Sequence, residues 1–468
     1  MIIERPPKGL TTIATTITIP NCIIVFICCP VTAHIVYLAL YKRFLNRVTV
    51  LSLYAAMSKR ERARAVSAVT SSLPLSTENE ALEMHLGPRV LVTKASLEVI
   101  LDFTIKEKVF ASDAARSHAT ALFAAVLQQF EAAEIKQLSV PFLRVEMVRQ
   151  ICQCSLHQQS SDAYLRSFFS AIGIDMASSL TTSIDTAALC TKIVQFTDYL
   201  IDNFFLPLKA CAAKTPQPTP APLSIPTIPA EDVLPGSRAR VSTLRRDCLI
   251  RDKHRCVVTR KFDKQEARRR HAECGQSAIG DDRQVFDWTD GTAFQTLEVA
   301  HILPHSLTNL EGHPQMTAAR KNALDILNMF DMDVHRLITG TDIDRPTNAL
   351  TLTRECHEEF GSFRMYFEAT GPPRTYRIAS YDLPAFSAVP QPLTRTLFQS
   401  PTIDSPHPRL LAVHAAIAKV LHMSAAGKYC DHILRDTEEA TFVDSDGTTN
   451  LGTLVTLRFN GWWDGVLA

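Results

Sequence analysis

The sequence has almost no net charge, since its 468 residues include 49 basic and 48 acidic side chains and carry a formal charge of only +1. This balance excludes a chain that binds nucleic acid as a uniformly positive molecule. Cysteine spacing also excludes a disulfide scaffold, because the twelve cysteines are irregularly placed and none form a Cys-x-x-Cys pair. We therefore expect thiols in a reducing, intracellular compartment, nuclear or cytoplasmic.

The N-terminus carries a long uncharged stretch from Cys22 to Tyr41. It is long enough to cross a bilayer, and the basic residues that follow would leave the C-terminal part in the cytoplasm. Pro30, His34 and the many β-branched residues argue against a membrane helix. Three interpretations of residues 1–57 stay open: a membrane segment, a buried hydrophobic element, or an extension upstream of a start at Met57.

The length predicts two or three domains, because one hydrophobic core rarely spans so long a chain. Residues 58–210 read as a helical accessory domain, with helices expected in 91–109, 114–130 and 189–205 and breaks near Pro141 and Gly173. Residues 211–237 are rich in proline and predict a semi-extended linker.

The remainder of the chain predicts an α+β module at 238–390 and a C-terminal segment at 391–468. Strands are expected at 255–259, 296–302, 363–367, 376–378 and 450–463, and helices at 317–330, 353–363 and 410–439. Gly427 is the weak point of the last helix. A polar cluster of Asp331, Asp333 and His335 is interpreted as helix-end capping in a solvated loop.

Basic residues concentrate at the start of this module. Residues 238–270 hold thirteen lysines and arginines against four acidic residues, a local surplus of nine positive charges. Such a block can follow the phosphates of a nucleic acid. The residues we expect to make those contacts are Arg245, Arg246, Arg251, Lys253, Arg255 and Lys261.

A His…Asn…His order is the feature that points to a reaction. His301 ends a strand-like run, Asn348 precedes a second one, and His357 follows nine residues after Asn348 in a segment predicted to be helical. Four pieces occur in order: Cys256-Val257-Val258-Thr259, Ala300-His301-Ile302-Leu303-Pro304, Asn348-Ala349-Leu350-Thr351-Leu352 and His357-Glu358-Glu359-Phe360. This set resembles the HNH endonuclease family, and in particular a branch found in many fungal proteins. The resemblance covers roughly residues 245–380 and extends to the helix expected at 410–439.

The resemblance implies a ββα-metal fold that holds one divalent cation, Mg²⁺ or a transition metal, over the phosphodiester of a nucleic acid, with DNA as the expected substrate. His301 would be the general base, since a neutral imidazole suits that task near pH 7. Asn348 would fix the loop or orient His301, and His357 would be a metal ligand.

Two departures from the family pattern bear on activity. Many members place an Asp or a second His directly before the base, whereas this chain has Ala300. Glu298 lies on the same strand face as Ala300 and is the simplest replacement ligand. His305, Asp342 and Asp344 are further candidates.

The second departure concerns the paired cysteines of zinc-stapled members. Here Cys256 is paired with Thr259, and Thr353 with Cys356, so each pair lacks one thiol. Two thiolates do not make a closed structural zinc site, and we predict none. The sequence thus predicts an HNH-type metal-dependent endonuclease. The alternative is a catalytically degenerate HNH-fold module that acts in DNA binding or protein interaction.

Overall fold

The structure is a computed structural model that divides into two compact units, Met1–Val90 and Leu91–Ala468. It describes three strands between residues 13 and 41, and then residues 97, 101–104, 108–134, 141–179, 185–212, 238–307, 314–382, 387, 389–390 and 392–439. The proline-rich linker and the strand expected at 450–463 lie outside the described residues, apart from 211 and 212.

The described part of the first unit is an antiparallel sheet in the order β1-β2-β3 (Ile13–Ile19, Cys22–Cys28, Ile35–Tyr41). The uncharged stretch therefore forms two paired strands rather than one helix, in keeping with its β-branched residues. Among the described residues, no single helix is long and apolar enough to span a membrane, and one bent pair, Pro408–Met423 with Ala426–Arg435, meets the criteria of length and composition only jointly. Membrane association of residues 22–41 stays a prediction.

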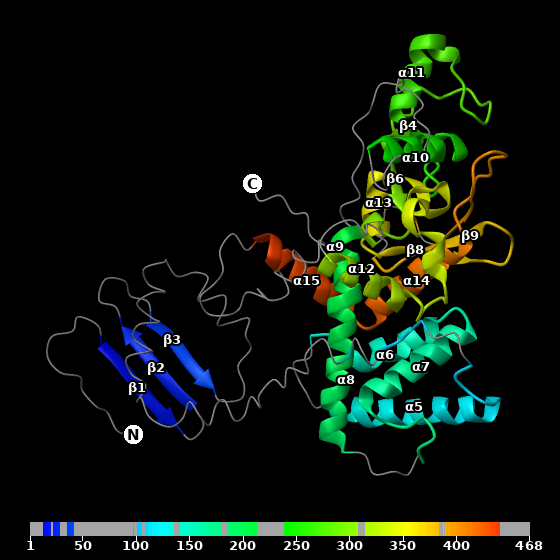
Figure 1. The fold of residues 1–468 in the computed structure, drawn as a ribbon. Helices are drawn as coiled ribbons and strands as arrows, with labels where there is room; N and C mark the ends of the chain where they lie inside the picture. Colours follow the sequence, from blue (N-terminus) through cyan, green and yellow to red (C-terminus); the bar gives the residue numbers. More distant parts are fainter. Residues whose placement is uncertain are drawn as a thin grey trace. The chain divides into compact units, whose positions relative to one another are not determined.

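The second unit begins with a group of helices that pack on one another (Figure 1). They are α5 (Asp113–Glu134), α6 (Arg144–Cys154), α7 (Gln158–Ile172), α8 (Thr186–Leu200), the π-helical turn η1 (Ile201–Phe205) and α9 (Leu206–Ala212). The helices expected at 114–130 and 189–205 are confirmed. The break at Gly173 is confirmed as well, since this residue ends α7 at φ 69°, where glycine carries no Cβ penalty. The helix expected at 91–109 is wrong for residues 101–104, which have no regular structure.

An α+β region follows, as predicted. Its helices are α10 (Arg238–Arg251), α11 (Lys264–Cys274), α12 (Pro314–Leu327), α13 (Arg354–Gly361), α14 (Pro408–Met423) and α15 (Ala426–Glu439). Its strands are β4 (Phe262–Asp263), β5 (Phe294–Gln295), β6 (Leu297–His301), β7 (Ala349–Thr353), β8 (Met365–Ala369), β9 (Thr375–Ser380) and β10 (Leu393–Thr396). They form the pairs β4-β5 and β6-β7 and the three-stranded sheet β10-β9-β8.

Two secondary-structure predictions for this region need correction. Residues 255–259 were expected to form a strand, but they form a turn in which only Arg255 bridges to Phe262. The expected helix 410–439 is broken by 84° between α14 and α15, at Ser424 and Ala425 rather than at Gly427. Ala425 lies at φ 59°, a left-handed conformation that ends a helix.

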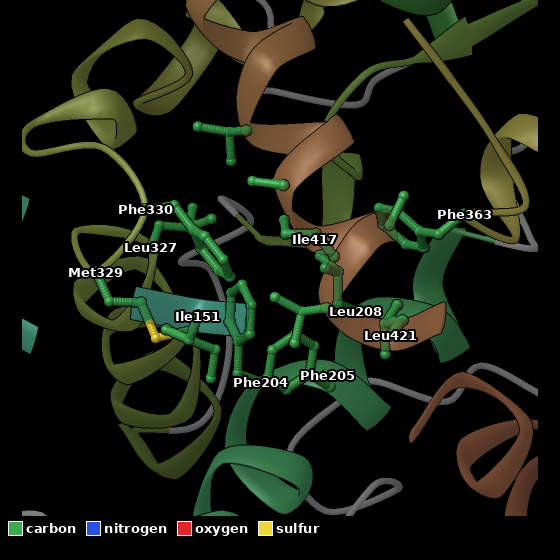
Figure 2. Close-up of a cluster of buried hydrophobic side chains, with 14 of the residues drawn as sticks. Ile151, Phe204, Phe205, Leu208, Leu327, Met329, Phe330, Phe363, Ile417 and Leu421 are labelled. Carbon is green, nitrogen blue, oxygen red and sulfur yellow. The ribbon is translucent and has the colours of Figure 1, made fainter. Parts of the chain in front are cut away.

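The helical region and the α+β region share one hydrophobic core. Figure 2 shows Ile151 of α6, Phe204 and Phe205 of η1, Phe330 after α12 and Ile417 of α14 in one cluster of buried side chains. α14 packs against α6 on one side and β8 on the other. The domain boundaries expected from the sequence stay predictions, but residues 91–468 form one compact unit.

A buried ion pair reinforces this packing and corrects the interpretation of Asp331 as a loop residue in solvent. The Asp331 carboxylate is 0% exposed and accepts hydrogen bonds of 2.7 and 2.8 Å from the guanidinium of Arg409, the second residue of α14. Nearby, Leu156 and Ser155 of the α6–α7 connection donate to the carbonyls of Phe330 and Met329.

We expect Arg409→Ala to destabilise the protein by about 2–4 kcal/mol, because it removes the two hydrogen bonds from the guanidinium and leaves the buried Asp331 carboxylate with only His157, 3.4 Å away, as a basic neighbour. Chemical denaturation should measure this loss. Arg345→Ala, which removes an exposed arginine paired with Asp404, is the matched control and should cost about 0–1 kcal/mol. Equal effects of the two substitutions would contradict the assignment.

A smaller core lies between the turn at 255–259 and β6. Phe262, Ala267, Ala278 and Phe286 are buried together, and the ring of Trp288 stacks on Phe294 at 5.3 Å. We call residues 262–294 the insertion; Figure 1 shows its helix, α11, at the end of this unit away from α5.

Ion pairs tie the insertion together. Burial acts to raise the pKa of Glu266, but hydrogen bonds from Arg269 and Arg270 outweigh it and lower the pKa to about 2. The hydrogen bond with His254, followed by that from Arg270, lowers the pKa of Asp281 to about 2. Both carboxyl groups titrate higher when unfolded, so their stabilisation is complete above about pH 4.5 and is lost as the pH falls towards 2.

We therefore expect the insertion to loosen between about pH 4.5 and 2. The fluorescence of Trp288, isolated by replacing the other two tryptophans with phenylalanine, should change over this window. In Glu266→Gln the change should be smaller, because one of the two titrating carboxyls is gone. A Trp288 signal that is constant down to pH 2 would refute the expectation.

Candidate functional site

The chain's His…Asn…His residues lie on a hairpin and the helix that follows it. β6 and β7 pair antiparallel, with His301 opposite Ala349 and Leu297 opposite Thr353. α13 starts directly after β7, where the Thr353 hydroxyl caps it by accepting the N–H of Cys356 at 3.4 Å. All five residues of β7 are buried, the threonines Thr351 and Thr353 included. The predicted strand, loop and helix context of the three residues is thus observed.

Asn348 joins the two loops that border this hairpin. Its side chain is fully buried, accepts the N–H of Leu303 at 3.0 Å and donates to the carbonyls of Leu303 and Ile343, each at 3.0 Å. Its own carbonyl accepts the N–H of Ile302. Both polar atoms of the amide therefore fix the backbone that follows His301 and the backbone that precedes Asp344, and the buried amide does not reach a substrate.

His301 pairs with a buried carboxylate. Its Nε2 lies 3.1 Å from Oδ1 of Asp344, whose side chain is 0% exposed. His301 is 8% exposed, and its Nδ1 is enclosed without a hydrogen-bond partner among the described residues. A donor at Nε2 fixes the tautomer in which Nδ1 carries the basic lone pair. The pair has the orientation of a general base held by a carboxylate.

Further charged groups surround Asp344. The Nε of Arg240 lies 3.8 Å and the Nε2 of His305 4.0 Å from its Oδ2. Burial lowers the pKa of His305; Asp344 opposes that shift, while the positive charges of His301 and Arg320 add to it. The sequence indicated His305 and Asp344 as candidates but gave no sign of Arg240 or Arg320, because α10 and α12 reach this place only by tertiary packing.

Glu298 and His357 form a second group. The Nδ1 of His357, on α13, lies 2.7 Å from Oε2 of Glu298, on β6. The two side chains are 12% and 21% exposed, so this pair is reached by solvent more easily than His301. Residues 298 and 301 are three apart on one strand and therefore leave β6 on opposite faces.

The residues fit a divalent cation only in part. A carboxylate beside an imidazole is a common donor set for such an ion, and Mg²⁺ in particular accepts few protein ligands and several waters. Within the described ranges, however, no three histidine, cysteine, aspartate or glutamate side chains are placed to hold a metal together. Ala300, buried in the main core, contributes no ligand.

The two incomplete cysteine pairs, Cys256 with Thr259 and Thr353 with Cys356, lie together in the structure. The Sγ of Cys256 accepts the N–H groups of Thr259 at 3.3 Å and Thr353 at 3.4 Å, and the thiol of Cys356 adds a hydrogen bond. Burial acts to raise the pKa of Cys256, but hydrogen bonds with Cys356, Thr259 and Val258 outweigh it and lower the pKa to about 6. Two threonine positions and two thiols thus connect the turn to the start of α13. The expected lack of structural zinc stays a prediction.

The residues expected to contact nucleic acid have different roles. Arg251 is 1% exposed and bonds to Asp252 and to the carbonyls of Pro346 and Ala349, so it is not available to a phosphate. Arg245 donates to the carbonyl of Leu297. Arg246 and Arg255 pair with Asp247 and Asp282. Much of the local surplus of positive charge is therefore paired or hydrogen-bonded inside the fold. Within the part of the chain that the structure describes, Lys253 and Lys261 form no ion pair, and they remain candidates.

The comparison with known proteins agrees with this geometry. Residues 256–368 match a family model described as HNH endonuclease. The match begins at Cys256 and ends in β8, so it includes the insertion, both strands of the hairpin and α13. No curated protein and no solved structure gives a significant match to the chain.

We expect Asn348→Ala to destabilise the protein by about 2–4 kcal/mol, because buried N–H and C=O groups of Leu303 and Ile343 lose their partners. Hydrogen exchange should show the loss as faster exchange of the Leu303 amide. Thr347→Ala, a substitution at the neighbouring half-buried position, serves as the control. Unchanged stability in Asn348→Ala would show that the loop does not depend on the amide.

Proposed function

We propose that residues 256–368, which match the HNH endonuclease family model, act as an HNH endonuclease module that hydrolyses phosphodiester bonds of nucleic acid, with DNA as the substrate. The observation that carries the proposal is the His301–Asp344 pair at the end of β6, in which a carboxylate holds one ring nitrogen and the other has no partner. A base in this arrangement can take a proton from a water that attacks phosphorus.

His301 and Asp344 act as a unit in this proposal. The hydrogen bond at Nε2 keeps the basic nitrogen at Nδ1, and the negative charge of Asp344 stabilises the imidazolium that forms once the proton has moved. Arg240, 3.8 Å from the same carboxylate, places a permanent positive charge beside it. Asn348 positions the base through the backbone of Leu303 and does not touch the substrate.

Glu298 and His357 are the residues that would hold the divalent cation that HNH modules use. A cation bound there would stabilise the negative charge that develops on the phosphate and the leaving oxygen. Through its contact with Nδ1, Glu298 orients the ring of His357, which leaves Nε2 as the nitrogen that would bind the cation. The choice between Mg²⁺ and a transition metal is part of the test.

A second candidate function rests on two observations at the same site. The basic nitrogen of His301 is enclosed, and the described residues supply only Glu298 and His357 around the cation position. Both features suit a module that has lost catalysis and binds nucleic acid or a protein instead.

Nicking of supercoiled plasmid by the full-length protein, with Mg²⁺, Mn²⁺, Ni²⁺ or EDTA, tests the proposal. We expect metal-dependent nicking, and a loss of roughly 10²- to 10⁴-fold in His301→Ala, because a general base contributes about that much. His357→Ala should require more metal for the same rate. His271→Ala, at an exposed histidine of α11, should keep full activity.

Retained DNA binding in a folded His301→Ala protein would separate catalysis from affinity. If the wild-type protein binds DNA and cleaves none with any of these metals, the degenerate module is the correct reading. Equal activity in His301→Ala and in the wild type would remove His301 from the mechanism.

A further inference from the structure

Two arginines from distant parts of the chain each donate a hydrogen bond to a backbone carbonyl close to the other arginine, beside the turn at 256–260. Arg395, on β10, donates from Nε to the carbonyl of Val258 at 2.6 Å. Arg260, at the end of the turn, donates from Nη2 to the carbonyl of Thr396, also on β10. Lys253 and Arg260 both lie over the ring of Phe398, at 5.9 and 4.1 Å from its centroid. We call Lys253, Arg260, Arg395 and Phe398 the arginine platform.

The platform keeps like charges together without a carboxylate partner for either arginine. Neither Arg260 nor Arg395 forms an ion pair with a carboxylate of the described residues, in contrast to Arg246, Arg251 and Arg255 nearby. Burial and then the charge of Arg395 lower the pKa of Arg260. Cys256 and then Asp252 act in the opposite direction, and the carboxylate of Asp252 is itself engaged in two hydrogen bonds with Arg251.

Arg260 is held in one orientation where solvent reaches it. Contact with the face of Phe398 fixes the guanidinium, since a cation is attracted to the ring. The side chains of Arg260 and Arg395 are half-buried, so both reach solvent, although the Nη1 of Arg260 is itself enclosed. A guanidinium fixed in this way beside a second one suits the oxygen atoms of a phosphate.

A purely structural role explains only part of this arrangement. The two hydrogen bonds to backbone carbonyls do tie the turn to β10, but neutral donors would do the same without repulsion between two cations. Charges of one sign held together are unfavourable unless an anion offsets them. The pairing of neighbouring arginines with carboxylates shows that this fold neutralises charge elsewhere in the same block.

We propose that the arginine platform binds phosphates of the nucleic-acid backbone. The proposal rests on the proposed function for the identity of the anion. Its location supports that choice, because the same turn is joined to β7 and α13: Val257 donates to the carbonyl of Thr351, and Cys256 accepts the N–H of Thr353. A nucleic acid held on the platform therefore contacts the turn that supports the start of the helix carrying His357.

Equilibrium binding of a labelled DNA duplex to the full-length protein, in EDTA and over a range of salt concentrations, tests the platform without any cleavage. In Arg260→Gln/Arg395→Gln the salt slope should fall by about two, because two phosphate contacts are lost. Affinity near 0.1 M salt should fall roughly 10- to 100-fold. Arg260→Lys/Arg395→Lys keeps both charges and should keep most of the slope.

The matched control is Arg246→Gln/Arg269→Gln, which removes the same net charge from two exposed, carboxylate-paired arginines of the same block. Equal losses in this control and in the platform variant would overturn the proposal, as would an unchanged slope in the platform variant. If the glutamine double variant does not melt cooperatively, the single variants Arg395→Glu and Arg246→Glu are compared instead. Only Arg395→Glu should weaken binding of the duplex.

The two proposals fail in different ways. A protein that binds the duplex through the platform but does not nick plasmid refutes the nuclease and leaves the platform intact. A protein that nicks plasmid while the platform variants bind as the wild type does refutes the platform alone. Loss of binding to anionic lipid vesicles in the platform variants, with duplex binding unchanged, would assign the site to a membrane surface and overturn the proposal.

Discussion

The buried pair of Arg251 and Asp252 is the interaction on which the arrangement of the module depends. Arg251 donates twice to Asp252 and also bonds to the carbonyls of Pro346 and Ala349, while Asp252 accepts the N–H of Thr351 at 3.3 Å. The end of α10 is thus fixed to the loop before β7 and to β7 itself. A buried charge survives only when its partner and its hydrogen bonds are all in place, so this pair specifies one position of α10 against the hairpin.

That position has consequences for the end of the hairpin that carries His301. With α10 held on β7, Arg240 lies beside Asp344, and Asp344 faces His301. On the other side of the hairpin, α13 is fixed through His414 of α14, whose ring stacks between Phe360 and Phe363 and whose Nε2 meets the carbonyl of Phe360 at 3.1 Å. Burial lowers the pKa of His414 to about 3, so the ring stays neutral in this stack. The helices of the first half, packed on α14, complete the support of the site.

The electrostatic design of the module differs from what the count of basic residues suggests. Most arginines of residues 238–270 bind other parts of the fold, either in ion pairs with acidic residues or in hydrogen bonds to backbone carbonyls. Charge that remains uncompensated concentrates where the turn at 256–260 meets β10, a strand more than 100 positions later in the chain. Affinity for an anion is therefore expected from a few cations on one surface rather than from the whole block.

The sequence by itself determined the elements that have local causes. The helices at 113–134 and 186–200, the α+β character of the second half and the hairpin with its following helix were predictable, because apolar periodicity, glycine and capping residues act over a few positions. The candidates His301, Asn348 and His357 were also visible, since the spacing that resembles the HNH family is itself a sequence property. The same local reasoning failed at 255–259, where left-handed residues Lys253, His254 and Arg260 make a turn that β-branched Val257 and Val258 do not indicate.

Only the tertiary structure decided which of the candidates meet. Asp344 joins His301 across 43 positions, Glu298 joins His357 across 59, and Arg260 meets β10 across 136. Whether a charge is buried and paired or remains free depends on such long-range neighbours, so Arg251 and Asp331 could not be recognised as buried partners from their sequence context. The sequence determines which side chains each helix or strand carries. Tertiary packing determines which other side chains they meet, and the charge and hydrogen bonding of each residue depend on those neighbours.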